Sequence, residues 1–165
     1  MTPIYDIIIK IRSTKLQRIL YIKTEKEMIE LGKLIGDKLI KNNVITLSGD
    51  LGAGKTTLTK GIGQALKVKS IINSPTFTIL KIHQGTMPLY HMDVYRINKD
   101  SGDDDLEEFF EMNGVCVVEW AENIGYLLPE EFLKIEIEIL KNSQRKVTIT
   151  GIGQEYKRLI EDLNI

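Results

Sequence analysis

A glycine-rich octapeptide restricts the possible folds of this chain more than any other segment: Gly49-Asp50-Leu51-Gly52-Ala53-Gly54-Lys55-Thr56. It matches G-x-x-x-x-G-K-[ST] at every fixed position, and it lies between a short apolar run, Val44 to Leu47, and a helical pattern from Thr57 to Leu66. In this context the pattern forms a P-loop, whose backbone N–H groups and helix N-terminus surround phosphate groups. Lys55 would then reach the β- and γ-phosphates, and Thr56 would hold Mg²⁺. The octapeptide therefore predicts a nucleotide site.

Composition limits the class of protein. The chain has 165 residues, 42% of them hydrophobic and 27% charged, which suits a single globular domain over 1–165 and excludes a disordered one. The net charge of −1 excludes a global basic field, so any connection to RNA runs through a partner or a local patch. The single cysteine, Cys116, excludes an internal disulfide, and no apolar stretch approaches the roughly 20 residues of a membrane-spanning helix. We expect a soluble cytoplasmic protein.

Hydrophobic patterning predicts an α/β fold in which helices cover a mixed sheet with antiparallel additions. One or two edge strands are expected within Pro3 to Lys23, and a helix follows from Thr24, with Glu27 completing a capping box, to about Asn42-Asn43. The remaining expected strands are 44–47, 77–82, 88–92, 115–118, 133–140 and 146–150, and the remaining helices are 57–66, 106–112 (opened by Asp103 to Asp105) and 154–163.

A P-loop also needs a carboxylate for the metal's water shell, at the end of a neighbouring apolar strand. Asp93 ends one such strand and Glu119 ends another. Each carboxylate also has an alternative interpretation without a metal: Asp93 can cap a turn, and Glu119 can face solvent. Trp120 either stacks near the nucleotide or packs in the core. His91 is expected to orient its neighbours rather than to act as an acid or base.

Three further features have weaker support. The segment Ser74-Pro75-Thr76-Phe77 follows the P-loop helix, where nucleotide switches keep a loop that responds to the γ-phosphate. Alone it reads as a turn before a strand. Arg96 and Arg145 either reach a nucleotide or face solvent.

Four segments taken together resemble the TsaE (YjeE) family of bacterial P-loop ATPases: GDLGAGKTT at 49–57, SPTF at 74–77, HMDVYR at 91–96 and VVEWAE at 117–122. Their order and spacing agree with the family over about 22–150. The resemblance implies a P-loop NTPase-type three-layer sandwich. It also implies an ATPase, weak alone, that is required for the threonylcarbamoyl modification (t6A) of the adenosine following the anticodon in tRNAs that read A-starting codons. The family works with TsaB and TsaD, and meets tRNA through that complex.

The resemblance also implies roles for individual residues. Gly52, Ala53, Gly54, Lys55, Thr56 and Thr57 would surround the phosphates of ATP. Thr56 and Glu119 would bind Mg²⁺, Asp93 would be a Walker-B-like carboxylate, and either Asp93 or Glu119 would position the attacking water. Trp120, Glu25 and Arg145 would lie near the nucleotide. Residues 1–16 precede the usual family start and are either an extra strand or a loose arm.

Three other functions fit a P-loop domain of this size. A small-molecule kinase usually clamps phosphates with several arginines on a lid, and the chain has five arginines and no lid-sized insertion after the P-loop. A GTP-dependent regulatory module uses N/T-K-x-D, which Asn98-Lys99-Asp100-Ser101 misses by one position. A module that binds ATP without hydrolysing it is the third.

Overall fold

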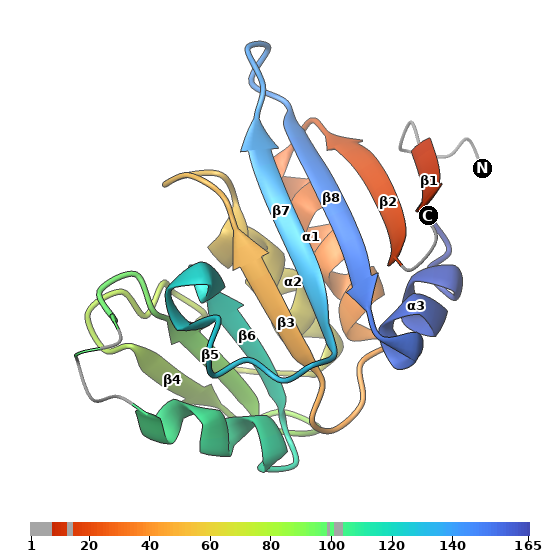
Figure 1. Cartoon of the computed structure of the whole chain (residues 1–165). Helices are drawn as coiled ribbons and strands as arrows, with labels where there is room; N and C mark the ends of the chain where they lie inside the picture. Colours follow the sequence, from red (N-terminus) through yellow and green to blue (C-terminus); the bar gives the residue numbers. More distant parts are fainter. Residues whose placement is uncertain (1–7, 13–14, 99, 101–103) are drawn as a thin grey trace.

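The computed structural model describes residues 8–12, 15–98, 100 and 104–165, and within them eight strands form one mixed sheet in the order β1-β2-β8-β7-β3-β6-β5-β4 (Figure 1). β3 pairs in parallel with both β6 and β7, and β5 pairs in parallel with β6. The pairs β1–β2, β2–β8, β7–β8 and β4–β5 are antiparallel. The strands are β1 (Ile8–Arg12), β2 (Lys15–Ile22), β3 (Val44–Ser48), β4 (Leu80–His83), β5 (Leu89–Asp93), β6 (Val115–Glu119), β7 (Phe132–Ile139) and β8 (Arg145–Ile152).

Helical layers on two sides of the sheet confirm the expected three-layer α/β fold. The helices α1 (Glu25–Gly36), α2 (Lys55–Ala65) and α3 (Gln154–Glu161) share one hydrophobic cluster with strand residues such as Ile45 and Leu47. The 3₁₀ helices η1 (Asp104–Glu111) and η2 (Ala121–Ile124) share a second cluster, which contains Val44. Because successive strand residues point to opposite faces, β3 contributes to both clusters and is buried on both sides.

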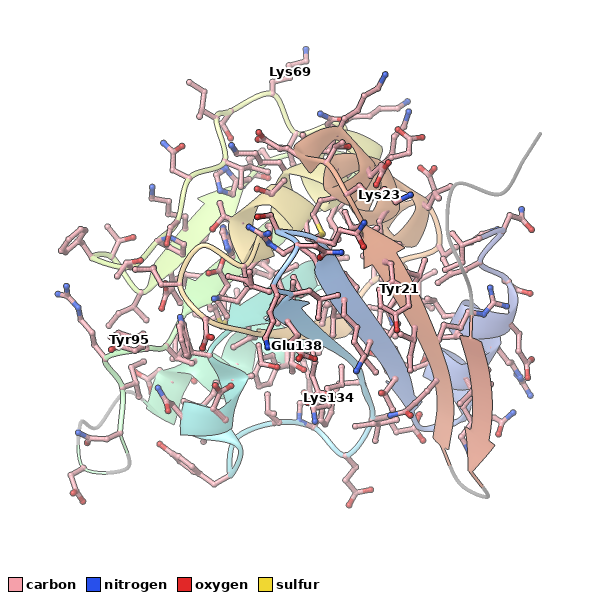
Figure 2. All side chains as sticks on the ribbon, turned by 90° about the horizontal axis from the view of Figure 1, so that it is seen from above. Tyr21, Lys23, Lys69, Tyr95, Lys134 and Glu138 are labelled. Carbon is pink, nitrogen blue, oxygen red and sulfur yellow. The ribbon has the colours of Figure 1, made fainter. Side chains whose placement is uncertain are left out.

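Strand β7 presents one polar face. In β7, Lys134, Glu136 and Glu138 alternate with the buried residues Leu133, Ile135 and Ile137. Figure 2 shows Lys134 and Glu138 on the side of the strands away from α1 and α2. This alternation confirms the half-exposed strand predicted from the sequence.

Two glycines set the contact between α1 and α2. A Cβ on Gly61 would lie 2.0 Å from the Ile29 carbonyl oxygen and 2.9 Å from the Gly32 Cα, and a Cβ on Gly32 would lie 2.1 Å from the Leu58 carbonyl oxygen. The helix backbones therefore touch directly. The crossing holds the P-loop helix against α1 with no side chain between them.

The first helix begins as predicted and ends early. The Thr24 hydroxyl accepts the Glu27 N–H at 3.1 Å, which confirms the cap, but α1 stops at Gly36 rather than near Asn42-Asn43. Leu39 is buried even though it lies beyond the helix, in a turn where its N–H donates to the Gly36 carbonyl. Leu39 follows Ile35 by four positions, the spacing of a helix, and this is why the sequence predicted a longer helix.

Other boundaries also shift. The P-loop helix begins at Lys55, two residues before the expected start. β4 begins at Leu80 rather than at Phe77, because Thr78 and Ile79 donate to the Pro75 carbonyl in a turn and Ile79 adopts a φ of 65°. The helix expected at 106–112 is η1, and Asp103, expected to open it, lies outside the described residues.

At the N-terminus, β1 occupies the sheet edge and β2 lies between β1 and β8. Both strands fall within 3–23, where one or two edge strands were expected, although 1–7 and 13–14 lie outside the described residues. Part of the stretch before 16 is therefore an added strand.

Candidate active site

The glycine loop connects β3 directly to α2, as its sequence context predicted. Gly54 occupies the N-cap position of α2 with a φ of 114°, a conformation that strains residues with a side chain. The N–H groups in the first turn of a helix have no partners inside the helix. The loop therefore places the N-terminus of α2, the positive end of its helix dipole, beside the adjoining pocket. This geometry suits a phosphate.

Lys55 lies inside this loop with only 5% of its surface exposed. Its Nζ donates to the carbonyl oxygens of Gly49 at 2.6 Å and Asp50 at 3.1 Å, and it lies 4.4 Å from the centroid of the Trp120 ring. Burial lowers the pKa of Lys55, and nearby carboxylates, Glu119 foremost, oppose that shift. An anion in the loop would favour the charged form that burial disfavours.

Two buried carboxylates lie at the same end of the sheet. Asp93 and Glu119 are register partners at the last positions of the parallel strands β5 and β6, and each is 3% exposed. Glu119 Oε1 accepts the Thr56 hydroxyl at 3.0 Å and pairs with His91 Nε2 at 2.8 Å. Glu119 thus faces the P-loop, not solvent.

Asp93 is held by the loop that follows α2. Its Oδ2 accepts the hydroxyls of Thr76 at 2.9 Å and Ser74 at 3.3 Å, and its Oδ1 accepts the Tyr95 N–H at 3.0 Å. The last of these bonds is the turn cap considered as the plain alternative for Asp93. The carboxylate therefore caps a turn and faces the pocket at once.

The side chains beside the P-loop fit a magnesium ion. Mg²⁺ prefers oxygen ligands and keeps several waters, so one or two protein oxygens suffice when phosphates supply the rest. The Thr56 hydroxyl and the Glu119 carboxylate are such a pair, already 3.0 Å apart. Among the described residues no group of three or more His, Cys, Asp and Glu side chains is arranged to hold a metal ion, so a metal here would rest on this pair, phosphate and water.

Trp120 forms part of the pocket wall. Its backbone adopts a φ of 62°, its N–H donates to the Leu47 carbonyl at 3.0 Å, and its ring lies 4.9 Å from that of Tyr95. The pocket of about 450 Å³ is lined by Leu51, Gly52, Gly54, Lys55, Thr56, Thr57, Ser74, Thr76, Asp93, Tyr95, Glu119 and Trp120.

A second pocket of about 370 Å³ adjoins the first and shares Gly52, Gly54 and Thr57 with it. Glu25 at the start of α1 and Arg145 at the start of β8 line it. The Arg145 guanidinium donates to the carbonyl oxygens of Ala53 at 3.1 Å and Gly52 at 3.2 Å. The two pockets therefore adjoin each other at the P-loop.

Comparison with known proteins supplies the family. A model described as threonylcarbamoyl adenosine biosynthesis protein TsaE matches residues 22–147, most of the chain. The chain belongs to the TsaE family. This confirms the resemblance drawn from its four motifs and places the chain in a family of tRNA threonylcarbamoyladenosine biosynthesis.

Relatives of the TsaE family match over most of their length. The protein named tRNA threonylcarbamoyladenosine biosynthesis protein TsaE from Bacillus subtilis is 46% identical over 140 residues, which cover 84% of this chain and 89% of that protein. The protein of the same name from Treponema pallidum is 36% identical, covering 77% and 96%. The crystal structure of YdiB from Bacillus subtilis superposes with a TM-score of 0.80 at 39% identity, covering 94% of this chain and 95% of that one.

In this TsaE chain every residue that the resemblance assigned to the site lines one of the two pockets. The roles assigned to these residues stay predictions. Arg96 is different, because its guanidinium lies 4.6 Å from the centroid of the Phe77 ring and it lines neither pocket. Among the described residues no helix is long and apolar enough to cross a membrane.

Four residues of the first pocket were not predicted as site residues. Ser74 and Thr76 belong to a segment recognised as a possible switch loop, but nothing in the sequence indicated that their hydroxyls bind Asp93. Tyr95 and Leu51 were also missed. Proximity to Asp93 and to the P-loop was the only signal that could have found them.

Proposed function

We propose that this chain binds Mg²⁺-ATP and hydrolyses ATP, and that it serves tRNA threonylcarbamoyladenosine (t6A) biosynthesis together with TsaB and TsaD, meeting tRNA through that complex. The observation that carries the proposal is the bond between Thr56 and Glu119, which joins the P-loop to a buried carboxylate of a neighbouring strand. We also propose that 1–165 is a single P-loop ATPase domain that acts in the cytoplasm.

The residues around the pocket have different roles in ATP hydrolysis. The N–H groups of the P-loop and Lys55 bind the phosphates and stabilise the charge that develops on them. Thr56 and Glu119 hold Mg²⁺, which neutralises phosphate charge when bound. Glu25, Arg145 and Trp120 contact the rest of the nucleotide from the two pockets.

Asp93 and the 74–79 loop link the nucleotide to a conformational change. Asp93 lines the pocket, where either it or Glu119 would position the attacking water, while Ser74 and Thr76 donate to the Asp93 carboxylate. A γ-phosphate and a water at Asp93 would compete for these hydroxyls, so hydrolysis would change the hydrogen bonds that hold the loop. We infer that the loop reports the nucleotide state to TsaB and TsaD.

Low activity of the isolated chain is part of the proposal. Among the described residues no arginine lines the pocket that contains Lys55, and Arg145 lines the adjoining pocket, bound to the carbonyls of the loop. Arginines that stabilise the phosphoryl transition state often come from a partner. In this proposal the complex activates the chain by supplying the arginine that the pocket lacks.

The test is Mg²⁺-ATP hydrolysis by the chain alone and with TsaB, TsaD and tRNA, with GTP in place of ATP as the nucleotide control. We expect turnover to rise with the partners and threonylcarbamoyl-tRNA formation to require it. Lys55→Ala and Glu119→Gln should each lower turnover by about 100-fold or more. Lys60→Ala, a second lysine of α2, should leave turnover unchanged. ATP binding without a response to the partners, preference for GTP, or phosphate transfer to a metabolite would contradict the proposal.

A further inference from the structure

Two buried histidine nitrogens have no hydrogen-bond partner. Within the described part of the chain, His83 Nε2 and His91 Nδ1 are the buried side-chain nitrogen or oxygen atoms in this condition. His91 is fully buried and His83 is 5% exposed. Buried polar atoms in folded proteins are nearly always paired with protein or with an ordered water. Each of these two atoms is therefore expected to have a further partner.

The strand register places the two imidazoles on one face. In the antiparallel pair β4–β5, Lys81 opposes His91 and His83 opposes Leu89. Because side chains alternate, His83 and His91 point to the same side as Leu89, the side of the cluster beneath α2. They are diagonal neighbours, a relation in which long side chains come within reach of each other.

Hydrogen-bond polarity at His91 follows from its partner. Glu119 Oε1 already accepts the Thr56 hydroxyl, so His91 Nε2, 2.8 Å away, is the donor of the second bond. In a neutral imidazole whose Nε2 donates, the other nitrogen, Nδ1, carries a lone pair and can only accept.

His83 has the complementary polarity. Its Nδ1 lies 2.7 Å from the hydroxyl of Ser70, and a hydroxyl that donates to Nδ1 leaves the proton on Nε2. Burial lowers the pKa of His83, with His91 and Lys81 adding to the effect, which favours the neutral ring with one proton. With Ser70 donating to Nδ1, the unpaired atom of His83 is a donor, and in a neutral His91 ring the unpaired atom is an acceptor.

We propose that Ser70, His83 and His91 form a hydrogen-bonded relay that ends on Glu119, with one buried water bridging His83 Nε2 and His91 Nδ1. The water accepts from His83 and donates to His91, so every bond runs in one direction from Ser70 to the carboxylate. His83 and His91 are positioning residues. The relay keeps the proton of His91 on Nε2, facing Glu119, and so holds the carboxylate that Thr56 also contacts.

The relay reaches from the surface to the centre of the site. Ser70 is exposed, and Figure 2 shows its neighbour Lys69 projecting into solvent beyond the end of α2. Without the water and His83, the tautomer of His91 that puts a lone pair against Glu119 would become accessible. That tautomer repels the carboxylate and releases it from its place beside Thr56.

The primary test is NMR of the whole ¹⁵N-labelled chain with any histidine tag removed, because the sequence contains only two histidines. We expect both imidazoles to carry their proton on Nε2. In His83→Phe the Nδ1 signal of His91 should move toward that of an imidazole without a bonded donor. In His83→Gln, whose amide N–H can donate as Nε2 does, the wild-type signal should return. Ser70→Ala, altered only at the surface end, should shift the His83 signals and provides the test if His83→Phe does not fold.

Activity gives a second readout, which rests on the proposed function of Glu119 as a metal ligand. Loss of residues that orient metal ligands typically costs about 10- to 100-fold in metal affinity or activity. His83→Phe should raise the Mg²⁺ concentration needed for half-maximal turnover about tenfold and leave KM for ATP unchanged. His83→Gln should recover most of the loss, and Lys69→Ala should change nothing.

Several results would overturn the relay. A proton on His91 Nδ1, His91 signals that are the same in wild type and His83→Phe, or equal effects of the Phe and Gln variants would each do so. If no variant hydrolyses ATP, the proposed function fails, but the NMR result still decides the relay.

Discussion

Replacing Gly61 with alanine should destabilise this fold, although alanine is the better helix former by about 1 kcal/mol. The new Cβ would lie 2.0 Å from the Ile29 carbonyl oxygen and 2.8 Å from the Lys33 nitrogen, both backbone atoms of α1. No side-chain rotation relieves such contacts. Real Cβ atoms keep at least 3.0 Å from other heavy atoms, so α1 and α2 must separate by about 1 Å.

The expected size follows from two opposing effects. Overpacking typically costs about 1–3 kcal/mol, and an obstacle made of backbone favours the upper end. Subtracting about 1 kcal/mol for helix propensity leaves a net loss of about 2 kcal/mol. For a chain of this length that lowers Tm by about 4–8 °C.

Thermal unfolding followed by circular dichroism, without nucleotide, would measure this shift. Gly125→Ala is the matched control, because Gly125 is exposed, has a φ of −51°, and its Cβ would meet nothing closer than 3.8 Å. That variant should be neutral or gain up to about 1 kcal/mol. If Gly61→Ala raises Tm as propensity alone predicts, the inferred backbone contact between the two helices is wrong.

Three further predictions concern single side chains. Arg145→Met removes the hydrogen bonds to the P-loop carbonyls and should weaken ATP binding about tenfold by calorimetry, whereas Lys146→Met should not; equal affinities would exclude a role for Arg145. Tyr156→Phe deprives the buried Val44 N–H of its acceptor and should cost about 1–3 kcal/mol in urea unfolding, and an unchanged midpoint would refute this. Burial raises the pKa of the Cys116 thiol from 9.0 to about 12, so only the unfolded chain releases this proton just above pH 9. The free energy of unfolding, relative to Cys116→Ala, should therefore fall above about pH 9 by up to about 1.4 kcal/mol per pH unit, and a constant difference between pH 8 and 10 would contradict the assignment.

The site was predictable where its signals are local. The P-loop, its strand and its helix lie within one segment, and Asp93 and Glu119 each end an apolar run. The bonds between these parts were not predictable, since they depend on β5 and β6 pairing in parallel so that Asp93 and Glu119 come into register. No local pattern encodes that register.

Errors in the predicted elements have the same origin. Phe77 has a high strand propensity, yet the turn closed on the Pro75 carbonyl delays β4 to Leu80. Leu39 fits the helical period but packs from a turn. In both places tertiary contacts, absent from a single sequence, decided where the element begins or ends.

The glycine contact between α1 and α2 gives the surroundings of the P-loop unequal stiffness. On one side two helix backbones touch, so Glu25 at the start of α1 and the P-loop at the start of α2 move as one body. On the other side, the 74–79 loop is tied to Asp93 by two hydroxyl bonds and by the bond from the Asp93 N–H to the Ile79 carbonyl, and hydrogen bonds exchange more easily than a packed helix pair. Strain introduced by a ligand is therefore relieved toward the loop. A protein bound to residues 74–79 would therefore be affected by this conformational change, whereas a protein bound to α1 alone would be affected very little.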